Sequence, residues 1–263
     1  MIIDVNGTAL FAATGGQEFD PEKPNLIFIH GAAMDHTAWV LQSRYLAHHG
    51  FNVFALDLPG HGKSGGDIPA SIDDMADWII AFMDAANLES AMLVGHSMGA
   101  LTALSTAGRY PDRISRLVMV GIAYPMMVGE DFLNMAREND PAAYQMMIDW
   151  SHARPSHMGA SEVPGLWMIG NALRTVENSG EDTLYKGLSI CAGYKGGFDA
   201  AENLQCPTLF ILGDRDMMTM PRAAQKLIQA IPNSETVMLE NCGHMQMIEK
   251  AQDVRNALSA FLK

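Results

Sequence analysis

Short apolar runs alternate with longer amphipathic segments through the first half of the chain. Four runs have the length and composition of buried strands: Leu26–Ile29, Val53–Leu56, Ala91–Val94 and Leu117–Gly121. The segments between them have the length and spacing of helices: Ala38–His49, Ile72–Asn87 and Met98–Arg109. Because two parallel neighbouring strands need a crossover connection, this alternation predicts a mainly parallel sheet with helices on both faces.

The two ends of the chain extend this pattern. At the N-terminus, Met1–Val5 and Thr8–Thr14 flank Asn6-Gly7, a dipeptide that favours a tight turn between antiparallel strands. After the middle of the chain, a strand, a helix, a strand and a final helix follow at Pro207–Leu212, Pro221–Ala230, Glu235–Leu239 and Gln246–Leu262. The segments together predict an α/β fold.

The middle of the chain, Tyr124–Gln205, departs from the pattern. It contains helical stretches such as Glu130–Glu138 and Pro141–Ser151, with connections rich in glycine and proline and no convincing strand. We therefore predict a core domain built from residues 1–123 and 206–263, with a helical insertion at residues 124–205.

Composition is that of a soluble globular protein. The 263 residues fit one large domain or one domain with an insertion, and 48% of them are hydrophobic against 18% charged. No apolar stretch approaches the roughly 18 residues that cross a bilayer. The N-terminal Met1–Asp4 lacks the basic region and long apolar run of a secretory signal, so we expect a cytoplasmic protein. The three cysteines fit no metal spacing and are expected to be reduced and buried.

The net charge of −13 limits the classes of partner. Nucleic acids and anionic membrane surfaces select for clusters of lysine and arginine, which an acidic protein does not favour. We expect neither as a partner, and the chain is expected to be a monomer or a homodimer that binds a small molecule.

The strongest chemical signal is Gly95-His96-Ser97-Met98-Gly99, directly after one predicted strand and directly before a helix. A serine on such a sharp turn holds its hydroxyl clear of the backbone, and the flanking glycines let chain segments approach closely. The following helix directs its N-terminal amides towards developing negative charge. In this context Ser97 is the candidate nucleophile.

A serine hydroxyl needs a base within hydrogen-bond reach and an acid that orients the base. His244 is the best placed of nine histidines, because it follows the last predicted strand on a loop at the carboxyl edge of the sheet. For the acid we choose Asp216, which follows another strand, with Asp214 as the rival. His96 is interpreted as a packing or hydrogen-bonding residue. The histidines on the predicted helix and in the insertion are expected at the surface: His48, His49, His152 and His157.

A further candidate motif, for stabilising the reaction intermediate, is His30-Gly31-Ala32-Ala33, which follows the strand that ends at Ile29. Attack of a hydroxyl on a carbonyl creates an oxyanion, which needs donors already directed at it. The backbone N–H groups of Ala32 and Met98 are the candidates, and whether Ala32 or Ala33 supplies the second donor stays open.

These motifs together resemble the α/β-hydrolase fold superfamily, in particular its small esterase-like members with a helical cap. The resemblance covers essentially the whole chain and rests on His30-Gly31 with Trp39, Asp57–Ser64, Gly95–Gly99, Gly213–Asp216 and Gly243-His244. It implies a mostly parallel, eight-stranded sheet with helices on both faces. It also places Ser97, Asp216 and His244 as the triad, Ala32 and Met98 as the oxyanion donors, and the insertion as a cap. Asp57–Ser64 matches a structural turn of the family, and no metal, nucleotide, flavin or other cofactor is implied.

The resemblance also narrows the reaction. Relatives that open epoxides or displace halide carry an aspartate where this chain has Ser97, so the serine favours acyl transfer. Relatives that cleave carbon–carbon bonds often have asparagine where this chain has His96. We therefore expect hydrolysis of carboxylic esters of small molecules through an acyl-enzyme. The alternatives are carbon–carbon hydrolysis of ring-fission products, lactone opening, or a non-catalytic protein that binds small molecules on this scaffold.

Methionines are frequent in the insertion and beside the proposed acid and base. Such flexible side chains could line an adaptable apolar pocket, although most of them are expected to fill ordinary core. The segment 124–205 has five lysines and arginines against eleven acidic residues, so a free ester is expected rather than one attached to an acidic carrier protein.

Overall fold

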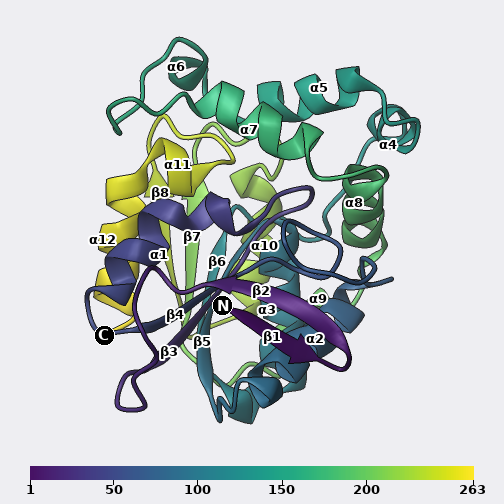
Figure 1. Ribbon diagram of the computed structural model, residues 1–263. Helices are drawn as coiled ribbons and strands as arrows, with labels where there is room; N and C mark the ends of the chain where they lie inside the picture. The colour runs from purple at the N-terminus through teal and green to yellow at the C-terminus, as the bar shows by residue number, and fades with distance from the viewer.

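The structure is a computed structural model that describes residues 1–263, and an eight-stranded sheet forms its centre (Figure 1). The strands lie in the order β1-β2-β4-β3-β5-β6-β7-β8. Their bounds are β1 (Ile2–Val5), β2 (Thr8–Ala13), β3 (Asn25–Ile29), β4 (Asn52–Leu56), β5 (Ala91–His96), β6 (Ile114–Val120), β7 (Thr208–Gly213) and β8 (Ser234–Leu239). The pairs β1–β2 and β2–β4 are antiparallel, and all others are parallel, so the predicted sheet is confirmed.

Helices cover both faces of the sheet. Their bounds are η1 (His36–Trp39), α1 (Val40–Ala47), α2 (Ile72–Ala85), α3 (Met98–Arg109), η2 (Pro111–Arg113), α4 (Glu130–Arg137), α5 (Pro141–Ser151), α6 (Arg154–His157), α7 (Met168–Glu177), α8 (Thr183–Gly193), α9 (Gly197–Glu202), α10 (Pro221–Ala230), α11 (Gln246–Glu249) and α12 (Ala251–Phe261). One face packs against α2, α3, α9 and α10, and the other against α1, α11 and α12. The molecule therefore has the three layers that the alternating pattern predicts.

The inner strand β3 shows how the sequence builds these layers. Successive side chains of a strand point to opposite faces. Ile27 and Ile29 enter the core under α2 and α3, whereas Leu26 and Phe28 enter the core under α1 and α12. Each of these four side chains is fully buried, which explains why the strand is apolar at every one of these positions.

The N-terminal hairpin forms as predicted. Asn6 and Gly7 connect β1 to β2 with φ values of 54° and 83°, the left-handed region that a two-residue hairpin turn requires. The turn pairs Val5 with Thr8 and brings β2 alongside β4 at the edge of the parallel strands.

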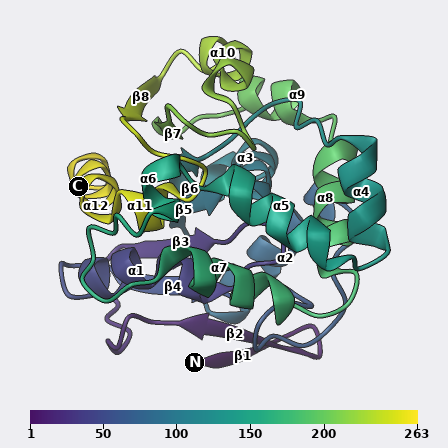
Figure 2. The ribbon, with the colours of Figure 1, turned by 90° about the horizontal axis from the view of Figure 1, so that it is seen from above.

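The segment 124–205 contains α4 to α9 and no strand. Helices α5 and α7 pack together and lie across the carboxyl edge of the sheet, with α6 at one end and α4 and α8 at the other (Figure 2). A separate apolar cluster that includes Phe132, Met147 and Leu188 joins these helices. Helix α9 packs instead against α3 and α10. The boundaries at 124 and 205 remain our proposal for the limits of the cap.

The structure differs from the sequence prediction in two helices. The predicted helix Ala38–His49 begins as the 3₁₀-helix η1, capped by the Asp35 carboxylate that accepts the N–H of Thr37. The predicted final helix Gln246–Leu262 is two helices, because Lys250 has non-helical φ and ψ of −126° and 51°.

The three cysteines are unpaired and buried, as predicted. None of the helices combines the length and hydropathy that crossing a bilayer requires.

Candidate active site

Ser97 lies on a strained turn between β5 and α3. Its φ and ψ are 55° and −115°, which only a fixed environment imposes on a residue with a side chain. A methyl group on Gly95 would lie 2.1 Å from the Gly99 carbonyl oxygen, and one on Gly99 would lie 2.3 Å from that of Ile29. The two glycines of the motif are therefore required for the strand and helix to meet at this angle.

Asp216 and His244 form a buried pair. His244 Nδ1 lies 2.8 Å from Asp216 Oδ2, and the two residues are 2% and 3% exposed, respectively. The carboxylate also accepts the N–H groups of Met218 and Thr219 and the Thr219 hydroxyl. Burial opposes ionisation, but the neighbouring His244 and these donors lower the pKa of Asp216 to about 2. An ionised Asp216 accepts Nδ1–H and leaves Nε2 of His244 free to act as a base.

The structure brings His244 beside the Ser97 turn without joining the two side chains. The ring of His96, which precedes Ser97, lies 4.6 Å from the His244 ring between centroids. No hydrogen bond forms between Ser97 Oγ and His244. Such bonds are often long in structures without substrate and tighten when the substrate is bound.

His96 is a hydrogen-bonding residue, as the sequence predicts. Its Nε2–H donates to the His244 carbonyl oxygen over 2.8 Å. Burial and the neighbouring His244 hold the pKa of His96 well below its usual value of 6.5, so the ring is neutral. His96 therefore fixes the loop of His244 without adding a charge beside it.

Ala32 and Met98 lie close to one another under the cap. The Ala32 N–H donates to no group of the chain, and the N–H of Met98, the first residue of α3, has no helix carbonyl to accept it. A methyl group on Gly187 of α8 would lie 2.7 Å from Ala32 Cβ and 3.4 Å from Met98 Sδ. The absence of a side chain at Gly187 therefore lets the cap approach both residues, whose N–H groups are the candidate oxyanion donors.

An apolar pocket of about 110 Å³ opens at Ser97. Its walls come from the loop after β3, the cap and the loop after β7. Its apolar lining includes Ala32, Met126, Met127, Val128, Phe132, Trp150, Leu188, Cys191, Met217 and Met218. Four methionines thus line the pocket. Others fill core instead, such as Met247, or lie exposed, such as Met158, so both interpretations of the methionines hold in part.

Asp214, the rival acid, has a different environment. Its carboxylate accepts the N–H of Cys242 and lies 3.6 Å from Nε of Arg215, and it makes no bond to His244. Asp214 therefore serves the turn after β7, and Asp216 is the acid that the geometry favours.

His152 is not at the surface, contrary to the prediction, and is 5% exposed. Its Nδ1–H donates to the Ile148 carbonyl, and burial lowers the pKa of the ring to about 4. The prediction was wrong because the insertion folds back onto the His244 loop. The carbonyl of Ser151 accepts the N–H groups of both His244 and Met245, which buries the neighbouring histidine.

Glu249 is a residue that the sequence analysis missed. It is 3% exposed, and its carboxylate accepts the N–H groups of Ala153 and Gly243 and the Ser156 hydroxyl, at 2.7–2.9 Å. Burial raises the pKa of Glu249. It therefore ties α6 to the loop just before His244. The sequence did carry one signal for this residue: Glu249 directly follows the apolar residues Met247 and Ile248 in a predicted helix.

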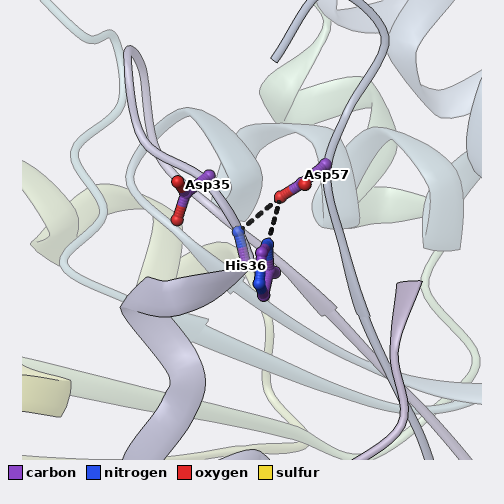
Figure 3. Close-up of side chains that lie close together, drawn as sticks. All are labelled: Asp35, His36 and Asp57. Carbon is purple, nitrogen blue, oxygen red and sulfur yellow. Dashed lines mark hydrogen bonds and ion pairs between the residues drawn. The ribbon is translucent and has the colours of Figure 1, made fainter. Parts of the chain in front are cut away.

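A second cluster of titratable groups, Asp35, His36 and Asp57, is explained by local structure (Figure 3). Asp57 accepts the N–H and Nδ1–H of His36 and the N–H of Lys63, while Asp35 caps η1. These bonds give the turn at Asp57–Ser64 a structural role, as the resemblance implies.

Comparison with known proteins decides the family. Residues 24–251 match the family described as alpha/beta hydrolase fold. This chain belongs to that family. The α/β-hydrolase assignment agrees with the three-layered fold, the strained serine turn and the order of Ser97, Asp216 and His244 along the chain.

Relatives of this α/β-hydrolase include an esterase and a hydrolase of a substituted succinate. It is 27% identical over 244 residues, 90% of each chain, to the (E)-2-((N-methylformamido)methylene)succinate hydrolase of Acinetobacter baylyi. It is also 27% identical over 245 residues to the pimeloyl-[acyl-carrier protein] methyl ester esterase of Nitrosospira multiformis, covering 86% of this chain and 90% of that protein. A thermophilic esterase of known structure superposes with a TM-score of 0.83 at 26% identity, over 100% of this chain and 96% of that one.

Proposed function

We propose that this α/β-hydrolase is a serine hydrolase that cleaves carboxylic esters of small molecules. The observation that carries the proposal is the strained turn at Ser97, which presents a hydroxyl beside unpaired amides and a buried histidine–aspartate pair. The proposed roles are Ser97 as nucleophile, His244 as general base and Asp216 as the acid that orients the base.

The proposed reaction has two stages. Ser97 Oγ attacks the ester carbonyl while Nε2 of His244 takes its proton, and the N–H groups of Ala32 and Met98 stabilise the oxyanion. The alkoxide leaves with the proton from His244, and the acyl group stays on Ser97. Water, deprotonated by His244, then attacks the acyl-enzyme, and the carboxylic acid departs as Ser97 regains its proton.

The pocket supports small esters with an apolar portion. Its methionines and the ring of Phe132 can adapt to short acyl or aryl groups. The acidic cap segment, with eleven acidic and five basic residues, is a poor surface for an acidic carrier protein. We therefore propose a free ester as the substrate, and no cofactor takes part in the proposed steps.

Pre-steady-state hydrolysis of p-nitrophenyl butyrate tests the proposal. We expect a burst of p-nitrophenol, because acylation precedes a separate deacylation step. Ser97→Ala should lose the burst and the turnover, as well as labelling by a fluorophosphonate. Ser115→Ala, at an exposed serine, is the matched control and should retain all three. A folded wild-type protein that hydrolyses no ester and resists the fluorophosphonate would refute the proposal.

A wider substrate panel separates the reaction classes. A preference of more than about tenfold in kcat/KM for a lactone or a dienolic ring-fission product would redirect the proposal to those substrates. Ligand-induced thermal stabilisation with the ligand recovered unchanged would instead support a non-catalytic binding protein.

A further inference from the structure

A second hollow adjoins the Ser97 pocket. It is an open groove of about 790 Å³ between α6, the loop after β7 and the start of α10. Met217 lines both hollows, so this exposed side chain separates the groove from the pocket that contains Ser97. A molecule that extends past Met217 would therefore lie in both.

Arginines are the distinctive residues of the groove, which is lined by Arg154, Arg215 and Arg222. Arg154 begins α6 in the cap, and Arg222 lies in the first turn of α10 in the core. The three arginines therefore come from separate parts of the chain and line one groove.

Two of these arginines have no partner in the protein. Arg215 lies 3.6 Å from the Asp214 carboxylate, whereas Arg154 and Arg222 form neither an ion pair nor a side-chain hydrogen bond. Three arginines outside the groove are paired with carboxylates: Arg109 with Asp77, Arg113 with Asp84 and Arg174 with Glu177.

The acidic groups of the groove do not neutralise the free arginines. Asp214 is engaged by Arg215, and Asp216 is buried and bonded to His244. The neutral His152 completes the titratable lining. Unpaired guanidinium groups bind carboxylates through two parallel N–H bonds. Because the chain as a whole carries a net charge of −13, these arginines are a local positive site and not part of a larger basic surface.

We infer that the groove binds a carboxylate of the substrate, so that the preferred esters are anionic: half-esters of dicarboxylic acids, or acyl esters of hydroxy acids. This inference rests on the proposed function, because it places the reacting carbonyl at Ser97 and the carboxylate beyond Met217. Either side of the ester can carry the charge, and the two sources are separated by the choice of substrate.

Matched pairs of esters test the inference. Monoethyl glutarate carries the carboxylate on the acyl side, and ethyl glutaramate replaces it with an uncharged amide. Butyryloxyacetate carries it on the alcohol side, and butyryloxyacetamide is its neutral partner. The measured quantity is the ratio of kcat/KM for the anionic ester to that for its neutral partner. We expect the ratio to exceed one for one of the pairs.

The variant Arg154→Gln with Arg222→Gln should lower that ratio about tenfold, mainly through KM, because it removes both unpaired charges. The double variant Arg154→Lys with Arg222→Lys keeps both positive charges but lacks the planar guanidinium groups. Its kcat/KM ratio should lie between those of the wild type and the double glutamine variant. Arg44→Gln, at an exposed arginine on α1 that forms no ion pair and no side-chain hydrogen bond, is the matched control and should leave the ratio unchanged. Equal ratios in the double glutamine variant and the wild type, for both pairs, would overturn the inference.

A binding measurement keeps this test independent of turnover. Calorimetry of monoethyl glutarate and ethyl glutaramate with Ser97→Ala should show tighter binding of the anion, and the added Arg154→Gln and Arg222→Gln changes should abolish the difference. Equal binding of the two ligands, or a preference that survives both changes, counts against the groove. If either of these results is found while the wild-type protein hydrolyses p-nitrophenyl butyrate, the proposed esterase function stands and the anion site does not.

Discussion

Two histidine–carboxylate pairs of this protein have the same geometry and different surroundings. His36 and His244 each place Nδ1 2.8 Å from a carboxylate oxygen, of Asp57 and Asp216, respectively. Both carboxylates are buried and accept backbone N–H groups as well. The His36 ring packs against Phe11, whereas the His244 ring lies beside His96 and the Ser97 turn. A histidine held by a carboxylate is thus a structural device in one loop, and its position next to a nucleophile makes it a candidate base in the other.

Removing each histidine gives the strongest test of this difference. His244→Ala should lower kcat for p-nitrophenyl butyrate by about 10⁴-fold or more, because in the proposed mechanism His244 takes the Ser97 proton. His36→Ala should leave kcat within about threefold of wild type and lower the free energy of unfolding by about 1–2 kcal/mol. Steady-state kinetics and denaturant unfolding of both variants provide the measurements. Similar losses of kcat in the two variants would contradict the assignment of the base.

The carboxylates should differ in the same manner. Asp216→Asn should reduce kcat on the order of 10⁴-fold, because an amide can hold His244 in the wrong tautomer. Asp57→Asn leaves the donors of His36 and Lys63 poorly matched, so it should cost about 2–3 kcal/mol of stability with kcat largely retained. Thermal unfolding and kinetics of the pair check this, and an inactive but fully stable Asp57→Asn protein would argue against a structural role.

The stability of the wild type should depend on Asp216 in acid. The pKa of this group falls from 3.8 to about 2 on folding, so its stabilising effect is present above pH 4 and is lost as pH falls towards 2. The expected loss is about 2 kcal/mol across that window. Urea unfolding at pH 4 and pH 2 measures it in wild type and in Asp216→Asn. The variant should show a shallower decline, and parallel declines would mean that other carboxylates are responsible.

A third buried carboxylate sharpens the comparison because it pairs with no histidine. In wild type, the N–H groups of Ala153 and Gly243 donate to the two carboxylate oxygens of Glu249. Glu249→Gln replaces one of these oxygens with an amide NH₂, which cannot accept, and should lower the free energy of unfolding by about 1–2 kcal/mol. By loosening the loop of His244 it should also lower kcat/KM about fivefold to tenfold. Glu240→Gln, at an exposed glutamate directly after β8, is the control. Wild-type kcat/KM in a destabilised Glu249→Gln protein would limit Glu249 to a purely structural role.

Much of the fold could be predicted because its signals are local. Strands such as Leu26–Ile29 are short and apolar, the Asn6-Gly7 turn has its own backbone preference, and the Ser97 motif carries its glycines within five residues. The order of the motifs then selects Asp216 and His244 from many acids and histidines. These inferences need no knowledge of how distant segments pack.

What could not be predicted depends on packing between distant segments. The burial of His152 and Glu249 follows from the contact between α6 and the His244 loop, which no periodicity encodes. The break at Lys250 interrupts a continuous helical pattern, and the arginine groove joins residues 68 positions apart in the chain, Arg154 and Arg222. Cap helices are positioned by the surface they cover, so their sequence alone defines neither the pocket nor its rim.

The Ser151 carbonyl, which accepts two N–H groups of the His244 loop, couples one end of the cap mechanically to the base. Lifting that end away from the sheet would displace the imidazole as well. At its other end the cap meets the core through van der Waals contact instead, where Gly187 of α8 packs against Ala32.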